Sequence, residues 1–437
     1  MSGLAILGGA CARTTPFAPW PQYSEQDEQR LLEVLRSRNW GGYPFPNRYA
    51  MEFGERFASQ HGAAHGCCVA NGTVAITIAI RASGLRFGDE VIVPAYTWDG
   101  TATAVLDAGC VPVFADIDPY SYCLSAAAAR AAITPKTRAI VPVHLAMRFA
   151  DMDALRALAR EHGLILIEDC AHAHGGAWNG EGGGSMGDAG TFSFQTSKTM
   201  TAGEGGAVIS SRLDLFEIVE SIVNCGRASS TDQYGKRVAG GNYRITEFQA
   251  ALLLGQLETL PDLNEQRARN AGLLSQALAG IEGVAALPPQ KKTTREFHYN
   301  YVFRYHPGDS GVSRDMFAAA LDAEGVPADG RFYEPVYRSD LFRVDAEQFP
   351  QLSTGREKPV NYSAVRCPVS ERAAYDEAVW LPQFVLLGTE QDVDDVARAV
   401  RKVMEHRGEL RGADPALAAV KAMSRAERPR VEKARNY

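Results

Sequence analysis

Lys198 and Asp169 are the residues whose types and positions could do chemistry together. Lys198 follows the apolar run at residues 191–194, among small and hydroxyl residues, and Asp169 closes the run at residues 164–167. A lysine amine can form a Schiff base with the aldehyde of pyridoxal phosphate, while a buried carboxylate keeps the pyridinium nitrogen of that cofactor protonated. Singly, each residue has a commoner explanation, as a solvated charge or a helix cap. As a pair, they indicate a pyridoxal phosphate site.

The elements that must position these residues form a regular alternation. Short β-rich runs, mostly separated by segments compatible with helices, predict a mostly parallel sheet covered on both faces, hence an α/β fold. Ligands of such sheets gather at the carboxyl ends of the strands. The predicted strands are residues 66–70, 90–94, 111–115, 139–143 and 164–167.

The polar groups that follow these strands complete the predicted site. Gly72 and Thr73 join a strand to a helix whose free amides suit a phosphate, and Ser193 adds a hydroxyl five residues before Lys198. Asn-Gly-Thr is also a common turn and N-cap. Trp98 could stack on one face of a planar pyridine, with Ala171 beneath the other face, although tryptophan more often packs in a core. Its place after a strand favours stacking.

The organisation of the chain predicts two domains with extensions. Residues 1–30 contain three prolines and read as an extended arm, and from Ser24 the apolar spacing becomes helical. We expect a large cofactor domain over 31–258 and a smaller C-terminal α+β domain over 259–408, with residues 409–437 as a solvated tail. A long helix should run to about residue 278, a strand should cover 298–304, and a last helix should lie around 390–406.

Composition excludes several classes of function. The chain has 437 residues, a net charge of −7 and eight scattered cysteines. A basic footprint for nucleic acid is missing, as are paired cysteines for zinc and an apolar stretch of membrane-spanning length. His172 and His174 have no third ligand at a suitable spacing, so we expect no metal. The sequence therefore predicts a soluble cytoplasmic protein with no nucleic-acid or membrane partner.

The residues resemble the DegT/DnrJ/StrS sugar aminotransferases, a family of fold type I pyridoxal phosphate enzymes that aminate keto-sugars and keto-cyclitols. The resemblance covers about residues 15–405. The segments that carry it are Asn71-Gly72-Thr73-Val74-Ala75, Glu90-Val91-Ile92-Val93-Pro94, Ala150-Asp151-Met152-Asp153, Glu168-Asp169-Cys170-Ala171-His172, Gly203-Glu204-Gly205-Gly206, Gly241-Asn242-Tyr243-Arg244 and Pro368-Val369-Ser370-Glu371-Arg372.

The resemblance implies a role for each candidate. Lys198 would hold the cofactor aldehyde, Asp169 would bind the pyridinium nitrogen, and Trp98 would stack on the ring. Gly72, Thr73 and Ser193 would hold the phosphate. The resemblance also implies that Asn242 reaches the phosphate of the neighbouring subunit, which would make the enzyme an obligate homodimer with shared active sites.

Two positions set this chain apart within the family it resembles. Gln195 stands where many relatives carry histidine. With this glutamine, the segment is more similar to the branch of cyclitol aminotransferases and aminohydroxybenzoate synthases. Ala146 and Met147 replace an aromatic residue and a glycine after His144. The second difference concerns a local turn and the pocket wall, and neither touches Asp169 or Lys198.

The resemblance implies transfer of an amino group from glutamate or glutamine to a keto-sugar, which could be nucleotide-linked, or to a keto-cyclitol, in secondary-metabolite (antibiotic) biosynthesis. A dehydratase or aromatase like the aminohydroxybenzoate synthases is the alternative. A non-catalytic regulator is disfavoured by the intact Asp169, Ser193 and Lys198. Arginine suits planar carboxylates, and the candidates for recognising the donor carboxylate or a hydroxylated ring are Arg227, Arg244, Tyr333 and Tyr337. For the two tyrosines, packing between domains remains open.

Overall fold

A seven-stranded sheet forms the centre of the computed structural model, which describes residues 3–43, 45–228 and 238–413. The strand order is β1-β9-β8-β5-β4-β2-β3. Neighbours from β3 to β8 pair in parallel, whereas β9 is antiparallel to β8 and β1. The mostly parallel α/β sheet is thus confirmed. The strands are β1 His65–Val69, β2 Glu90–Pro94, β3 Val111–Ala115, β4 Thr137–Ile140, β5 Ile165–Asp169, β8 Ala189–Ser193 and β9 Gly206–Ser210.

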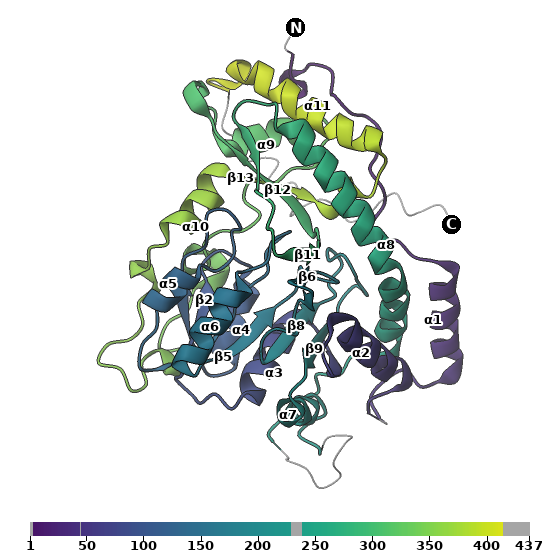
Figure 1. The fold of residues 1–437 in the computed structure, drawn as a ribbon, viewed down its shortest axis with the longest axis vertical. Coiled ribbons are helices and arrows are strands. Elements are labelled where there is room, and N and C mark those ends of the chain that lie inside the picture. The colour runs from purple at the N-terminus through teal and green to yellow at the C-terminus, as the bar shows by residue number, and fades with distance from the viewer. Residues whose placement is uncertain (1–2, 44, 229–237, 414–437) are drawn as a thin grey trace.

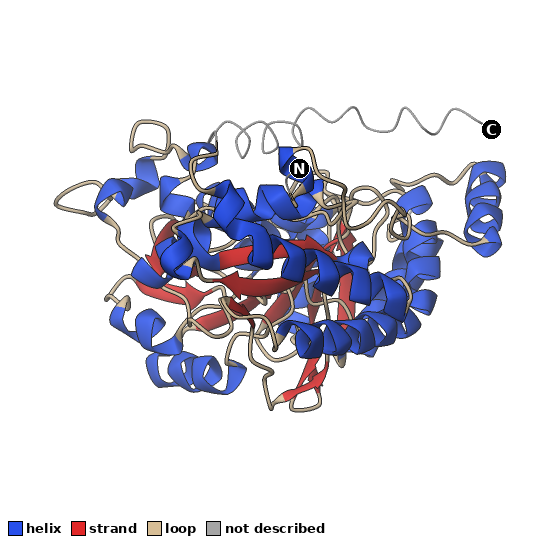
Figure 2. Cartoon of the chain, turned by 90° about the horizontal axis from the view of Figure 1, so that it is seen from above, coloured by secondary structure: helices blue, strands red, loops and turns tan. Residues whose placement is uncertain are grey.

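Helices cover both faces of this sheet because its strands are apolar on both sides. In β2, Val91 and Val93 belong to one buried cluster and Ile92 to the other, as the alternation of side chains along a strand requires. Figure 2 shows the strands between the two layers of helices. One layer contains α3 Gly72–Ala82, α4 Asp99–Asp107 and α7 Leu213–Val223, and the other contains α2 Arg48–His61, α5 Ala126–Ala131 and α6 Met152–His162.

The longest helix, α8 Glu247–Leu278, connects the large sheet to the C-terminal part (Figure 1). Thr246 caps its start: the Thr246 side chain accepts from the Gln249 N–H, and Gln249 accepts in return from the Thr246 N–H. The helix ends at the predicted residue 278. It runs through the predicted domain boundary at 258, so this boundary has no corresponding break in the chain.

A three-stranded antiparallel sheet of order β10-β12-β13 forms the centre of the C-terminal part. The predicted helix around 390–406 is α11, and the predicted strand at 298–304 begins two residues later, as β12. The elements are β10 Val284–Ala286, β12 Asn300–Tyr305, β13 Ala378–Pro382, α9 Arg314–Ala323, α10 Pro368–Arg372 and α11 Glu390–His406.

Regular structure is present at both ends of the described chain. Helix α1, Glu25–Ser37, begins directly after Ser24, as the helical spacing predicted, and Ser24 and Asp27 form a capping box at its start. Leu410 is buried, so the packed body extends past residue 408. Most of the predicted tail, residues 414–437, lies outside the described residues.

The remaining elements are short. The third sheet contains β6 Ala177–Trp178, β7 Glu181–Gly182 and β11 Thr293–Arg295. The 3-10 helices are η1 Ala5–Leu7, η2 Gly308–Ser310, η3 Val336–Arg338, η4 Asp340–Phe342, η5 Pro350–Leu352, η6 Tyr362–Ala364, η8 Gln383–Leu386 and η9 Arg407–Leu410, and η7 Ala373–Glu377 is a π-helix. None of the helices in the described part of the chain is long and apolar enough to cross a membrane.

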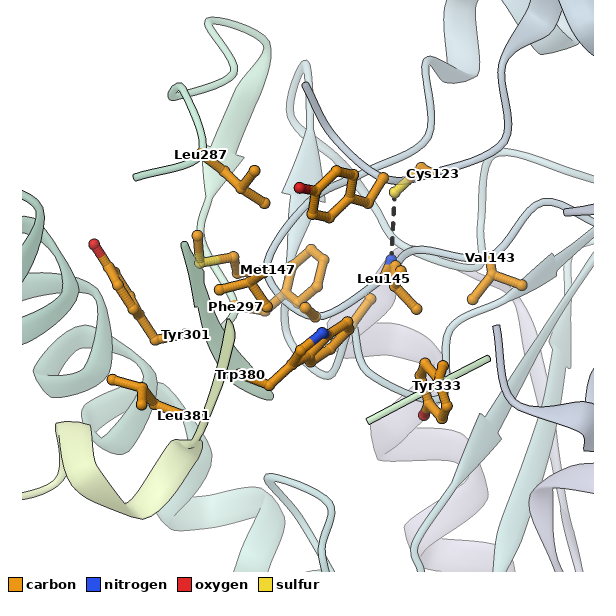
Figure 3. Packing of buried hydrophobic residues seen from close by; sticks show 14 of the residues in the cluster. Cys123, Val143, Leu145, Met147, Leu287, Phe297, Tyr301, Tyr333, Trp380 and Leu381 are labelled. Atoms are coloured by element: carbon orange, nitrogen blue, oxygen red, sulfur yellow. Dashed lines mark hydrogen bonds between the residues drawn. The ribbon is translucent and has the colours of Figure 1, made fainter. Parts of the chain in front are cut away.

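Trp380 ties the C-terminal sheet to the carboxyl ends of the central strands. The Trp380 indole is fully buried, and its N–H donates to the Tyr96 hydroxyl at 3.1 Å. The Trp380 ring lies 5.6 Å from the Tyr333 ring, and Figure 3 shows both side chains in this packing. The C-terminal part therefore supplies one wall at the edge where the candidate residues were predicted to meet.

Candidate active site

Lys198 lies on the loop between β8 and β9, at the carboxyl end of β8. The Lys198 backbone N–H donates to the Gln195 carbonyl at 2.9 Å. The Gln195 side-chain oxygen accepts from the backbone N–H (2.8 Å) and hydroxyl (2.7 Å) of Ser197. These local bonds give the loop a fixed shape, which holds the lysine at the edge of the sheet.

The Lys198 amine has the surroundings expected of a reactive amine. Nζ lies 4.3 Å from the centroid of the Tyr299 ring. Among the described residues it has no hydrogen-bond partner or ion pair. Burial lowers the pKa of Lys198 from 10.5 to about 8, against a smaller opposing effect of the Asp169 charge. A lysine with this pKa is partly neutral near neutral pH and can act as a nucleophile or base.

Asp169 ends β5 as a buried carboxylate held by two donors. Its Oδ2 accepts from the Thr101 hydroxyl at 2.8 Å, and its Oδ1 accepts from the Ala171 N–H at 3.1 Å. Burial raises the pKa of Asp169, whereas these bonds and the Lys198 charge lower it. Thr101 was not a candidate from the sequence, although its place on the first turn of α4, three residues after Trp98, follows from the helical period.

Gly72, Thr73 and Ser193 meet at the start of α3, as predicted for the phosphate site. The Asn71 side chain caps the helix by accepting from the Val74 N–H at 2.9 Å. The N–H groups of Gly72 and Thr73 donate to no other described residue. A Cβ on residue 72 would lie 2.6 Å from the Ser193 Cβ, so only glycine allows Ser193 to lie this close to the start of α3. Unpaired amides at a helix N-terminus are suited to an anion.

Trp98 lies over the first turn of α4, beside this anion site. A Cβ on Gly100 would lie 2.6 Å from the indole Cδ1 and 2.9 Å from the Thr73 hydroxyl oxygen. The indole is half exposed, although most residues around it are buried. Ala171, two residues after Asp169, is partly buried. The indole is therefore free to stack on a planar ligand that reaches from the anion site towards Asp169.

His172 is a neutral imidazole in the inner wall of the site. Its Nδ1 accepts from the Ala146 N–H at 3.1 Å, so the single proton is on Nε2, 3.3 Å from the Tyr333 hydroxyl. The ring stacks on Tyr299 with centroids 3.9 Å apart. Burial lowers the pKa of His172 well below its usual value. Ala146 makes its contact from a left-handed backbone, with φ of 56°.

His174 has a structural role. The His174 Nε2 lies 2.9 Å from the Ser193 carbonyl oxygen, to which it donates, and its Nδ1 lies 3.3 Å from the Thr199 hydroxyl. The imidazole is fully buried. It therefore joins the end of β8 to the segment that follows Lys198 and does not face a ligand.

His144, Glu168 and Cys170 form a buried cluster behind Asp169. Glu168 Oε1 accepts from the N–H groups of Met186 and Gly187, both at 2.7 Å. Glu168 Oε2 accepts from the Gly184 N–H at 3.0 Å and from His144 Nε2 at 2.9 Å. The carboxylate thus holds the loop at 184–187, and these four donors occupy its lone pairs.

The remaining predicted residues lie outside this group of contacts. Arg227 and Arg244 donate to Asn224, at 3.2 Å and 2.9 Å, and Asn242 is exposed. The Tyr337 hydroxyl donates to Glu371 at 2.7 Å and accepts from the Cys367 N–H at 3.0 Å. The structure does not test their predicted roles, which stay predictions. Tyr333, by contrast, belongs to the site through its contacts with His172 and Trp98.

These residues together fit pyridoxal phosphate. The unpaired amides at the start of α3, with the Ser193 side chain close to Gly72, suit its phosphate, and the Asp169 carboxylate suits its ring nitrogen. Trp98 can stack on its ring, and the Lys198 amine has no hydrogen bond to give up before reaching its aldehyde. Tyr299 and Thr101 also belong to this arrangement, although neither was a candidate from the sequence.

Comparison with known proteins gives a consistent result. The model of the DegT/DnrJ/EryC1/StrS aminotransferase family matches residues 21–401. A Streptoalloteichus tenebrarius protein, named as a candidate L-glutamine:3-amino-2,3-dideoxy-scyllo-inosose aminotransferase, is 46% identical over 414 residues, which cover 94% of this chain and 100% of that protein. An L-glutamine:2-deoxy-scyllo-inosose aminotransferase of the same organism is 38% identical over 423 residues, which cover 93% of this chain and 99% of that protein.

Solved structures agree with these relatives. A 3-amino-5-hydroxybenzoic acid synthase superposes with a TM-score of 0.80 at 34% identity, over 90% of this chain and 100% of the synthase. The aminotransferase DesI, solved in the presence of its TDP-sugar product, gives a TM-score of 0.79 at 30% identity, over 94% and 98% of the two chains.

Proposed function

This chain belongs to the DegT/DnrJ/EryC1/StrS aminotransferase family, and we propose that it transfers the α-amino group of L-glutamine to the ketone of a cyclitol. It is a pyridoxal phosphate-dependent aminotransferase. The proposal for the donor and acceptor rests on the relatives named for L-glutamine and an inosose, which are 38% to 46% identical over nearly their whole length. Such a reaction belongs to aminocyclitol antibiotic biosynthesis.

The observation that carries the proposal is the placement of Lys198 and Asp169 around one ligand position. Lys198 presents an amine whose pKa is lowered to about 8, and Asp169 presents a carboxylate that Thr101 holds in place. The bound cofactor supplies an aldehyde that accepts amino groups and an electron-poor ring that withdraws electrons from the carbon carrying them. Residues of the protein supply the proton transfer and the positioning that the reaction also requires.

The position of each residue in the site gives it a separate role in the reaction. The neutral Lys198 amine removes the α-proton of the amino donor, and the ammonium that results carries that proton until it is returned. Asp169 keeps a proton on the nitrogen that faces it by pairing as the anion. The amides of Gly72 and Thr73, with the Ser193 hydroxyl, hold the phosphate and so fix the distance from the anion site to Lys198.

A homodimer with shared active sites is part of the proposal. Asn242 is exposed and its side chain forms no hydrogen bond with a described residue, which suits a residue that reaches into a second subunit. A cavity of about 360 Å³ lies along the edge strand β1, and the nearby Trp40 and Tyr43 are exposed by 51% and 82%. Exposed aromatic residues beside an open strand edge are typical of an interface.

A dehydratase or aromatase is the second candidate, because the synthase of 3-amino-5-hydroxybenzoic acid is 34% identical in sequence. The full-length relatives named as aminotransferases are more similar, at up to 46%. The two reactions differ in their products. Transamination yields a keto acid from the donor, whereas the alternative releases water without a keto acid.

The visible absorption spectrum of the purified protein tests the first half of the proposal. The band of the lysine-bound cofactor should bleach when L-glutamine is added and return when a keto-cyclitol follows. Lys198→Ala should show neither the band nor turnover. A wild-type band that L-glutamine leaves unchanged would contradict the proposed donor, and wild-type turnover by Lys198→Ala would contradict the assignment of the lysine.

A further inference from the structure

Arg267, on the long helix α8, is a fully buried cation whose hydrogen-bond partners are all neutral. Its guanidinium donates from Nε to the Gln383 side-chain oxygen at 2.8 Å and from Nη1 to the Asn264 side-chain oxygen at 3.1 Å. In the described part of the chain Arg267 forms no ion pair. A charge in the protein interior costs free energy unless a group of opposite charge compensates it. The structure thus contains a buried cation whose anion must come from elsewhere.

Two neighbouring donors at this position have no acceptor. Arg267 Nη2 and Gln383 Nε2 are both closed off from solvent, and neither forms a hydrogen bond with a described residue. The bond from Arg267 Nε to Gln383 Oε1 brings these donors together: Nη2 is on the same edge of the guanidinium as Nε, and Nε2 is bonded to the same carbon as Oε1. Donors in a protein interior are normally paired, so two adjacent unpaired donors indicate a bound acceptor.

The acceptor at this position needs a negative charge. Burial lowers the pKa of Arg267 to about 9, which is still above neutral pH, so the guanidinium remains charged. This charge also contributes to lowering the pKa values of the buried His174 and His298. The Trp20 ring, 5.3 Å from the Arg267 Cζ, adds a cation–π contact but no net charge. A water molecule could accept both hydrogen bonds but would leave the charge of Arg267 uncompensated.

We propose that a small monovalent anion of the halide class, such as chloride, binds between Arg267 Nη2 and Gln383 Nε2. Both side chains are almost completely buried, so the occupant must be small and must carry its charge on the atom that accepts the hydrogen bonds. A halide ion meets both conditions. The bound ion joins α8 to the start of η8 and so stabilises the C-terminal part against the long helix. This anion site is independent of the proposed reaction.

Thermal unfolding of the holoenzyme at constant ionic strength tests this site, with chloride exchanged for gluconate, which is too large to occupy it. The Tm of the wild type should rise by about 2 °C for each tenfold increase in chloride concentration above the Kd, because a ligand that binds only the folded state stabilises it. Crystals grown with bromide should show anomalous scattering beside Arg267 Nη2 and Gln383 Nε2. A Tm that does not depend on chloride, or a water molecule in place of bromide, would overturn the inference.

The variant Gln383→Glu supplies the missing negative charge covalently. Its carboxylate would keep the bond to Arg267 Nε and place a second oxygen beside Nη2, in the bidentate geometry typical of arginine and a carboxylate. The Tm of this variant should therefore not depend on chloride. The matched control is Gln256→Glu, because Gln256 is a buried glutamine on α8 whose amide donates to the Gln22 carbonyl, and this variant should keep the wild-type chloride response. A chloride response that persists in Gln383→Glu would contradict the anion site.

Discussion

Tyr299 packs against Lys198, with its ring centroid 4.3 Å from Nζ, and its hydroxyl lies 2.8 Å from the Ser197 hydroxyl on the same loop. The ring also stacks on His172 and meets the Phe332 ring edge to face, and the Tyr299 backbone N–H donates to the Ala146 carbonyl at 2.9 Å. One residue from the C-terminal part thus contacts three segments of the active site. It is a positioning residue for the lysine.

Two substitutions of Tyr299 should distinguish the contribution of its hydroxyl to kcat from that of its ring. Tyr299→Phe keeps the ring under Lys198 but loses the bond to Ser197, so kcat should fall by about 2- to 10-fold, and Ser197→Ala should give a similar fall. Tyr299→Leu also removes the cation–π contact and should lower kcat by at least about tenfold. Steady-state kinetics and the cofactor spectrum measure the effects of both Tyr299 substitutions. The control is Tyr301→Phe, whose lost partner is Ser275; an equal fall in that variant would contradict the positioning role.

Thr101→Val should weaken the binding of the cofactor. The Thr101 hydroxyl donates to Asp169 and lowers its pKa, so its removal raises that pKa further and leaves less of the anion at low pH. We expect the Kd for pyridoxal phosphate to rise about tenfold near neutral pH, and by more at pH 6. Titration of the apoenzyme measures this change. Thr103→Val, on the same helix, is the control, and a matching loss there would refute the specific role of Thr101.

Cofactor capture by the apoenzyme should depend on pH through Lys198. Burial lowers the pKa of Lys198 to about 8, so the amine is charged below this value and neutral above it. The rate of capture should rise as pH increases through about 8 and then level off, because the neutral amine is the nucleophile. Stopped-flow absorbance measures the rate. A rate that still rises tenfold per pH unit at pH 9 to 10 would show instead that the lysine has its ordinary pKa.

Glu168→Gln should destabilise the fold without a direct effect on the chemistry. Both oxygens of the buried carboxylate accept two hydrogen bonds each, and an amide would place its NH₂ group against two of those donors. The free energy of unfolding should fall by about 3 kcal/mol. Urea denaturation measures this loss. Glu161→Gln removes an exposed ion pair with Arg130 and should leave stability almost unchanged, because solvent screens such a pair; similar losses in both variants would be inconsistent with the role of Glu168.

Sequence patterns predicted the parts of the site that follow from strand ends. The apolar runs at 90–94 and 111–115 became β2 and β3 with the same bounds, and Asp169 and Ser193 end their strands. Tyr299 was not predicted, because it comes from a distant segment that only tertiary packing brings to Lys198. Thr101 was missed for a related reason: a hydroxyl on a helix is informative only when its partner is known.

Substrate residues proved hardest to predict from the sequence. Of the four candidates, Tyr333 contacts the site through His172, whereas Tyr337 makes its hydrogen bonds with Glu371 and Cys367. Both residues are tyrosines and lie four positions apart in the sequence, so neither residue type nor spacing could show which of them contacts the site. Arg227 and Arg244 donate to Asn224, which forms a β-bridge with Asn242, and the roles predicted for all three candidates stay predictions.

Transfer of a labelled amino group tests the central claim most directly. The purified holoenzyme is incubated with L-glutamine that carries ¹⁵N in its α-amino group and with the ketone 3-amino-2,3-dideoxy-scyllo-inosose, and the products are analysed by mass spectrometry. We predict that the label appears in the new amine of the cyclitol, with one keto acid formed from glutamine for each label transferred. A dehydrated product, or a cyclitol without the label, would contradict the account.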